Sequence, residues 1–240
     1  QGVGGGTSNI QPAMESGEFD IYPEYTGTAW NMVLMESGVY DESLFGELQA
    51  RYETDYDMSW LGMYGFNNTY GLVVRTEIAK RYGIETYSDL AKVDDRLTFG
   101  AEYDFFERED GYDALCETYG LDFGATMDMD IWLKYQALNQ GEIDVMVIFT
   151  TDGQLSTADA VVLADDKGFF PSYLCGNVVR NEVLSEHPEL EEIFAKLTDT
   201  ITDADMAAMN YAVETEGAEP RDVAMDFLRD HGLLNEEAYA

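Results

Sequence analysis

The chain has 240 residues, of which 45% are hydrophobic, and its 48 acidic and 13 basic residues give a formal net charge of −35. Nucleic acid is excluded as a partner, because phosphate binding needs clustered lysines and arginines, and docking on anionic membranes is disfavoured by the same repulsion. No apolar run approaches the roughly eighteen residues of a membrane-spanning helix. The acidic charge has two interpretations, a heavily solvated surface or the steering of cationic ligands.

Strand and helix signals alternate through the first third of the chain. Thr7 and Ser8 are typical helix N-caps, and Pro23 is expected to end the first strand. Segment 41–55 is amphipathic, with apolar residues at helical spacing. The elements predicted here are helices over 8–16, 24–37 and 41–55 and strands over 19–22 and 70–74.

The same alternation continues to residue 180, after which only helices are predicted. The most apolar strand is 143-IDVMVIF-149, which runs into a polar turn. Strand followed by helix is typical of an α/β protein with a largely parallel sheet. The further strands predicted are 97–101, 143–149, 160–166 and 173–180. The further helices predicted are 76–83, 87–92, 110–119, a segment after Asp128 that ends at Gly141, and then 186–199, 203–215 and 219–231.

No catalytic or metal-binding signature is present. The chain has no GxSxG, HExxH or P-loop lysine motif, and its two histidines lie in polar helical surroundings. The glycine-rich stretch 2–8 is interpreted as a loop before a helix, with a phosphate cradle as the alternative. Cys116 and Cys175 form no CxxC spacing, so they indicate neither zinc nor a redox site and are either free or paired. No cofactor is predicted.

The stretch 19-FDIYPEYTGTAW-30 combines aromatic side chains with acidic charge. Tyr22, Tyr25 and Trp30 could form part of a hydrophobic core, or their π-faces could attract a quaternary ammonium group. Aromatic residues recur beside turns at other predicted strand ends, where ligands of open α/β sheets bind. They are Tyr25, Tyr70, Phe149 and Tyr173.

These segments, taken in order over nearly the whole chain, resemble the substrate-binding proteins of ABC importers for glycine betaine, choline, carnitine and related osmolytes. The resemblance implies a two-lobed type II periplasmic-binding-protein-like α/β fold with a ligand cleft between the lobes. We expect one lobe to comprise 1–74 with 176–240, and the other 75–175. The motifs are GGT at 5–7, GEFDIYPEYTGTAW at 17–30, GFNNTY at 65–70, SDLAK at 88–92, FFEREDGY at 105–112, YQALNQGEIDV at 135–145, FTTDGQL at 149–155, LADDKGFFPSY at 163–173 and VVR at 178–180.

The resemblance also implies a division of roles within the site. In this family an aromatic box, mostly of tyrosines, holds the trimethylammonium head, and polar groups hold the tail. Tyr22 and Trp30 are expected to be packing residues. The positions of this chain that match the family's ligand-binding residues are Tyr25, Thr28, Tyr70, Arg108, Phe149 and Tyr173.

Two departures from the family pattern bear on these expectations. Relatives often carry Tyr where this chain has Phe149, and Asp where it has Val147, which predicts a more apolar pocket. Relatives also begin earlier, with a strand and a helix that are expected to be missing here. An open sheet edge in the first lobe would then invite self-association.

The function that the resemblance implies is the extracytoplasmic binding of a quaternary ammonium osmolyte and its delivery to an ABC permease. A lipid anchor or fusion to the permease would hold the domain at the membrane. One alternative is a sensor or interaction module of the same fold without a transport role. The other is a hydrolase using Asp104, Glu107 and Asp110 near Arg108, although nothing marks a general acid and its companion there.

Overall fold

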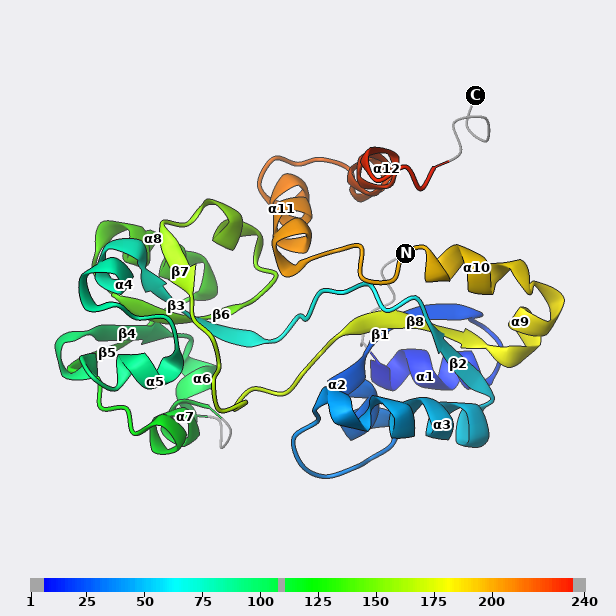
Figure 1. Ribbon diagram of the computed structural model, residues 1–240, viewed down its shortest axis with the longest axis horizontal. Helices are drawn as coiled ribbons and strands as arrows, with labels where there is room; N and C mark the ends of the chain where they lie inside the picture. Colours follow the sequence, from blue (N-terminus) through cyan, green and yellow to red (C-terminus); the bar gives the residue numbers. More distant parts are fainter. Residues whose placement is uncertain (1–6, 108–110, 235–240) are drawn as a thin grey trace. The chain divides into compact units, whose positions relative to one another are not determined.

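The computed structural model describes residues 7–107 and 111–234, which divide into two compact units (Figure 1). The first unit comprises Gln1–Thr69 with Pro171–Ala240, and the second comprises Tyr70–Phe170. The chain passes from one unit to the other twice, and the sequence predicted these passages after residues 74 and 175. The contacts place them after 69 and 170, because β3 (Tyr70–Arg75) is hydrogen-bonded along its length to strands of the second unit.

The sheet of the first unit has three strands in the order β1 (Ile21–Tyr25), β8 (Cys175–Arg180) and β2 (Met58–Leu61). Both pairings are antiparallel. The prediction that Pro23 ends the first strand was wrong, because Pro23 lies within β1. β1 is an edge strand of the described sheet, where a residue without a backbone N–H is tolerated.

Helices of the first unit precede and follow these strands. The predicted helix over 24–37 was wrong in its extent, because β1 runs to Tyr25 and helical structure ends at Val33. The core beside the sheet contains Trp30, Tyr40, Tyr52 and Trp60, each at most 6% exposed. The helical elements are α1 (Thr7–Glu15), α2 (Thr26–Thr28), the π-helix η1 (Ala29–Val33), η2 (Glu42–Leu44), α3 (Phe45–Tyr56), α9 (Asn181–Glu186), α10 (Glu189–Ala195), α11 (Asp203–Glu214) and α12 (Pro220–Asp230).

The sheet of the second unit has five strands in the order β5-β4-β6-β3-β7. β3 is antiparallel to β6 and β7, and β4 is parallel to β5 and β6. The expectation of a largely parallel sheet was therefore wrong. The successive strands β3 and β4 share this sheet, yet they run in opposite directions, because β6 is parallel to β4 and antiparallel to β3. The new strands are β4 (Thr98–Ala101), β5 (Ala125–Asp128), β6 (Val145–Phe149) and β7 (Ala160–Val162).

Both faces of this five-stranded sheet are covered, as the continuous apolar character of β6 requires. Val145 and Val147 enter one buried cluster, whereas Met146 and Ile148 enter a second cluster with residues of α8. The sequence did not predict β5 as a strand. The helical elements of this unit are α4 (Thr76–Tyr82), α5 (Tyr87–Leu90), η3 (Asp94–Arg96), α6 (Tyr103–Glu107), α7 (Tyr112–Tyr119), α8 (Ile131–Gln140) and η4 (Gly153–Thr157).

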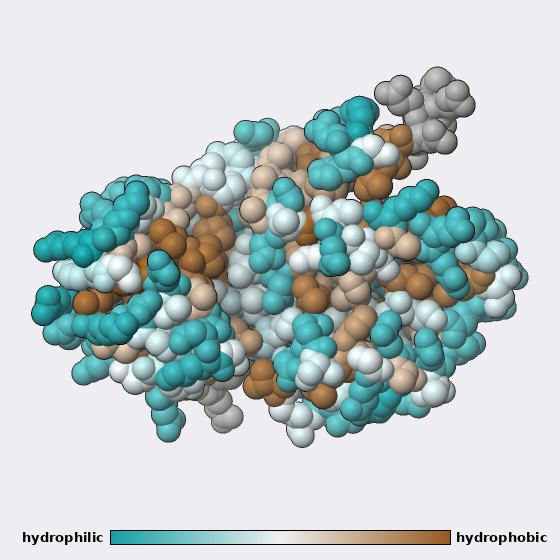
Figure 2. Space-filling model, viewed as in Figure 1, coloured by the Kyte–Doolittle hydropathy of each residue, from teal (hydrophilic) through white to brown (hydrophobic). Residues whose placement is uncertain are grey.

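The surface of each unit is mainly hydrophilic on the face drawn in Figure 2, with apolar side chains in smaller groups. Within the described ranges, no helix combines the length and hydropathy needed to cross a bilayer. Cys116 is half-buried and Cys175 is buried, and both are free thiols.

Candidate ligand-binding site

The second unit gathers four aromatic rings at the ends of its two central strands, and we call Tyr70, Phe105, Phe149 and Phe170 the aromatic group. Tyr70 begins β3 and Phe149 ends β6, and the two are register partners in the antiparallel pair. Their ring centroids lie 4.6 Å apart with the planes inclined by 32°. The Tyr70 ring also lies 5.6 Å from Phe170 and 6.0 Å from Phe105.

The pairing of β3 with β6 brings the Tyr70 and Phe149 rings together. Leu72, Val147 and Ile148 are at most 1% exposed, so they fix the register of β3 against β6, and the pairing carries Tyr70 opposite Phe149 at the strand ends. Phe105 is buried, whereas Tyr70, Phe149 and Phe170 are each half-buried. These three rings therefore retain accessible surface that could contact a ligand.

Asp152 holds the turn that follows Phe149. Its Oδ2 accepts hydrogen bonds from the backbone N–H of Phe149 at 3.2 Å and from the Tyr135 hydroxyl at 3.0 Å. Burial raises the pKa of this carboxyl, while the two hydrogen bonds and the nearby charge of Lys134 oppose the increase. Sequence analysis did not select Asp152, although it belongs to the FTTDGQL motif.

Lys134 is a buried cation in the same unit, with a side chain that is 1% exposed. Its Nζ donates to the carbonyl oxygen of Val147 at 2.7 Å and forms an ion pair with Glu102. The Val147 side chain is fully buried in the core of this unit, where it packs near Leu72 and Phe99. Lys134 lies within an apolar helix in the sequence, and nothing there indicated its charged partner.

The first unit places Tyr25, Thr28 and Tyr173 around the turn formed by α2. Tyr25 ends β1 opposite Cys175, and Thr28 ends α2. Gly27 approaches the 171–173 segment closely, since a Cβ there would lie 2.5 Å from the Ser172 carbonyl oxygen and 2.9 Å from Cε1 of Tyr173. The Tyr173 ring therefore packs against this turn in the space that Gly27 leaves.

Two asparagines of the GFNNTY motif position these tyrosines. Asn67 Oδ1 accepts from the backbone N–H of Tyr173 at 2.7 Å, and the Asn68 N–H donates to the Tyr173 carbonyl at 3.1 Å. The Asn68 side chain is also a hydrogen-bond partner of the Tyr25 hydroxyl. Burial raises the pKa of Tyr25 to about 12, although the bond to Asn68 opposes the increase. The sequence indicated a turn at 66–69 but no such bonds.

Two carboxylates, Glu24 and Glu42, each accept two hydrogen bonds from residues in or beside the turn that follows β1. Glu24 is 3% exposed and accepts from the Thr7 hydroxyl and the Tyr25 N–H, each at 2.7 Å. Glu42 Oε1 accepts from the Thr26 hydroxyl at 3.2 Å and the Ser172 hydroxyl at 2.5 Å. The sequence did not indicate these two residues, because in such an acidic chain no sequence pattern distinguishes a buried carboxylate from a solvated one.

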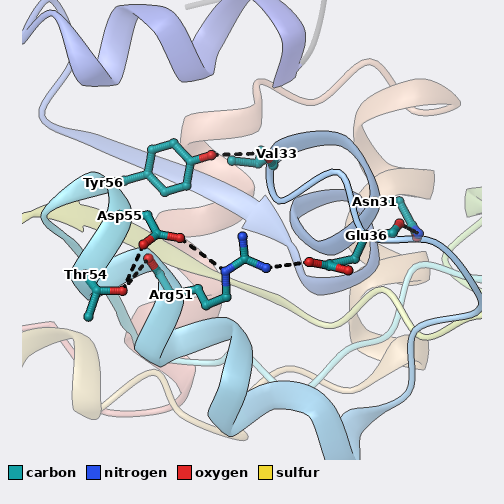
Figure 3. Close-up of polar contacts among 7 residues, drawn as sticks. All are labelled: Asn31, Val33, Glu36, Arg51, Thr54, Asp55 and Tyr56. Atoms are coloured by element: carbon teal, nitrogen blue, oxygen red, sulfur yellow. Dashed lines mark hydrogen bonds and ion pairs between the residues drawn. The ribbon is translucent and has the colours of Figure 1, made fainter.

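The segment that follows Thr28 is tied to α3, as Figure 3 shows. Arg51 bonds Glu36 at 2.6 Å and Asp55 at 3.1 Å, and the Tyr56 hydroxyl donates to the Val33 carbonyl at 3.1 Å. Asn31 adds bonds from its side chain to the carbonyl oxygens of Glu36 and Gly38. The π-helix and the loop after it are thereby fixed against α3.

The remaining predicted residues divide into packing residues and residues that the structure does not describe. Trp30 is 6% exposed in the core of the first unit and Tyr22 packs against that core, so the prediction that both are packing residues was confirmed. Arg108 and Asp110 lie outside the described residues, as does the side chain of Asp104. Glu107 is exposed. Within the described part of the chain, no cluster of three or more His, Cys, Asp or Glu residues could hold a metal ion.

Residues 2–230 match the family model described as the substrate-binding domain of ABC-type glycine betaine transport systems. A crystal structure of a glycine betaine/carnitine/choline ABC transporter has a TM-score of 0.90 and 38% identity, covering 96% of this chain and 86% of that one.

Two curated relatives are also similar along most of this chain. One is the ergothioneine transport permease/ergothioneine binding protein of Helicobacter pylori, 45% identical over 97% of this chain and 42% of the relative. The other is a carnitine transport binding protein of Listeria monocytogenes, 36% identical over 96% of this chain and 76% of the relative. The chain thus spans less than half of the first relative and about three quarters of the second. It belongs to the substrate-binding domain family of ABC-type glycine betaine transport systems.

Proposed function

We propose that this domain binds a quaternary ammonium compound outside the cytoplasm and delivers it to an ABC permease without catalysing a reaction. The observation that carries the proposal is the aromatic group, in which the half-buried Phe149 and Phe170 rings lie 4.6 and 5.6 Å from the half-buried Tyr70 ring. A quaternary ammonium group donates no strong hydrogen bond, so aromatic faces recognise it better than a single carboxylate does. The surplus of acidic residues also favours a positively charged ligand.

The ligand class follows from the relatives together with these residues. Ergothioneine, carnitine and glycine betaine, which the family description and the relatives name, each combine a trimethylammonium group with a carboxylate. Because the Helicobacter relative has the higher identity of the two, ergothioneine belongs in the ligand panel beside the three osmolytes. The permease would be either a separate chain or part of the same polypeptide, and a lipid anchor or this fusion would hold the domain at the membrane.

Roles within the site are proposed residue by residue. Tyr25, Tyr70, Phe149 and Tyr173 would contact the trimethylammonium head, and Thr28 would donate a hydrogen bond to the tail. Arg108 would hold a carboxylate by a charge-assisted hydrogen bond. The test is isothermal titration calorimetry with choline, glycine betaine, carnitine and ergothioneine. Binding of at least one is expected, and the absence of heat with all four, measured on the natural full-length protein, would overturn the proposal.

Tyr70→Ala is expected to weaken choline and glycine betaine alike by about 3- to 30-fold, because one ring contributes roughly 0.5–2 kcal/mol to a cationic head. Tyr70→Phe keeps the ring and should remain close to the original affinity. Tyr82→Ala is the matched control, since Tyr82 lies on α4 outside the aromatic group. Equal losses in Tyr70→Ala and Tyr82→Ala would show that the effect is not specific to the head-group contact.

Arg108→Ala should distinguish recognition of the ligand's carboxylate tail from recognition of its trimethylammonium head. Removing the guanidinium is expected to cost glycine betaine about 1.5–3 kcal/mol, the usual contribution of a hydrogen bond to a charged group. Choline ends in a hydroxyl, so its affinity should stay nearly unchanged or improve as a positive charge is removed. Competition titrations of both ligands against this variant give the comparison. Equal losses for the two ligands would contradict a role in reading the carboxylate.

A further inference from the structure

Aromatic residues of the candidate site share an unusual backbone feature, because several donate their own N–H to a carboxylate. Phe149 donates to Asp152 at 3.2 Å and Phe170 donates to Asp165 at 2.9 Å. In the first unit, Tyr25 donates to Glu24 at 2.7 Å. A carboxylate oxygen therefore lies within hydrogen-bonding distance of the backbone nitrogen of each of these aromatic residues.

Asp152 is the member of this set whose charged surroundings are most completely described. Lys134 and Glu102 neutralise one another as an ion pair, and both act electrostatically on Asp152. The Tyr135 hydroxyl donates to Asp152 and stays neutral, because burial and the nearby carboxylates raise its pKa. Asp152 and Glu102 are acids and Lys134 is a base, so this network has a net charge of one negative unit when Asp152 is ionised. That charge lies at the backbone nitrogen of Phe149, whose ring centroid is 4.6 Å from that of Tyr70.

We propose that Asp152 determines charge specificity at this site: its carboxylate, bonded to the backbone N–H of Phe149, makes the aromatic group prefer a permanently charged trimethylammonium over a neutral group of the same shape. The inference rests on the proposed function and assigns Asp152 a role that involves no contact with the ligand. It differs from the roles of the rings, which touch the head group and provide its apolar contact surface.

The physical reason is that aromatic rings alone discriminate weakly by charge. A neutral tert-butyl group has nearly the shape of a trimethylammonium and gains the same apolar contact with Tyr70 and Phe149. Only the ring quadrupole and fixed charges distinguish the two groups. A carboxylate removed from bulk water interacts with a nearby cation several-fold more strongly than a solvated one, since the effective dielectric constant is lower there.

A pH dependence follows, with its sign set by Asp152. Burial raises the pKa of this carboxyl above its ordinary value, so acidification protonates it earlier than a solvated aspartate. Choline carries a fixed charge and does not titrate in this range. Its affinity should fall as the pH decreases through the raised pKa and recover above it, whereas a neutral analogue should show no such change.

The decisive experiment uses matched pairs of charged and neutral ligands. Choline is paired with 3,3-dimethylbutan-1-ol, and glycine betaine with 3,3-dimethylbutanoate, each measured by competition calorimetry. The two members of each pair share the same tail and differ only in the head, which is a charged trimethylammonium in one and a neutral tert-butyl group in the other. Asp152→Asn retains a side-chain oxygen for the Phe149 N–H and the Tyr135 hydroxyl but loses the charge. We expect it to weaken choline and glycine betaine by roughly 3- to 10-fold and to leave both analogues with the neutral head unchanged. Glu142→Gln, an exposed carboxylate of the same unit, is the matched control.

Two further measurements separate this role from a structural one. The thermal midpoint of ligand-free Asp152→Asn at pH 7 should be equal to or higher than that of the original protein. A buried carboxyl with a raised pKa contributes stability only when protonated and loses it as the pH rises. Tyr135→Phe removes one hydrogen bond to the ionised form, so the acid-side loss of choline affinity should move to higher pH.

The outcomes are distinguishable. Equal weakening of the charged and neutral members of each pair in Asp152→Asn would overturn the inference and make Asp152 a residue that merely shapes the turn. Unchanged affinities for both members would overturn it as well. If the original protein bound neither choline nor glycine betaine, the inference would be overturned. The proposed function would still be supported if the protein bound carnitine or ergothioneine.

Discussion

Lys134→Ala is expected to destabilise the second unit by about 3–5 kcal/mol, the usual cost of removing one partner from a buried ion pair. The Lys134 side chain is 1% exposed, and its Nζ serves both Glu102 and the Val147 carbonyl. Its loss leaves a carboxylate and a buried carbonyl without their donor, together with a cavity. Urea denaturation followed by hydrogen exchange of peptides from β6 and α8 would measure the loss and locate it.

Two comparisons test the cause of this destabilisation. Lys80→Ala removes an exposed lysine from α4 of the same unit and should change stability little. Lys134→Met combined with Glu102→Gln replaces the pair by neutral side chains of similar volume, and should recover most of the loss. If the double variant were as unstable as Lys134→Ala, the ion pair would not be the cause.

Phe99→Ala is expected to cost about 3–5 kcal/mol, as is typical of removing a fully buried aromatic side chain. Phe99 lies in β4 with no exposed surface, and its ring centroid is 4.9 Å from that of Phe123 and 5.1 Å from that of Tyr112. It also contacts Phe105 at 6.3 Å, and Phe105 in turn contacts Tyr70. The substitution should therefore lower the urea midpoint and also weaken ligand binding through the aromatic group.

Phe99→Leu provides the graded control. Leucine fills much of the same volume, so the loss should be clearly smaller than for alanine, with the edge and face contacts of the ring accounting for the remainder. An alanine variant no less stable than the leucine variant would show that this cluster collapses around the gap and leaves no cavity.

Much of the fold could be predicted because it depends on local patterns. The apolar run of β6 and the amphipathic stripe of α3 each dictate an element, and the alternation of strand and helix indicates the α/β class. Pairing partners are not local. The sequence of Tyr70–Arg75 contains nothing that states whether it runs parallel or antiparallel to β6, and the exposed β5 offered no apolar run to detect.

The candidate site shows the same division. Tyr25, Tyr70, Phe149 and Tyr173 could be found because each lies beside a turn signal at a strand end. Their supporting groups, such as Asn67, act on residues far away along the chain. Asn67 serves Tyr173, more than a hundred positions away, and only tertiary structure reveals that bond.

The surroundings of the half-buried Cys116 and the buried Cys175 have a practical consequence for following ligand binding. Burial raises the pKa of Cys116 to about 11 and that of Cys175 to about 12, so almost none of either is thiolate at neutral pH. Since maleimides and disulfides react with the thiolate, a cysteine introduced on an exposed surface would be modified long before either native one. A single fluorophore could therefore be attached beside the aromatic group without first removing the natural cysteines.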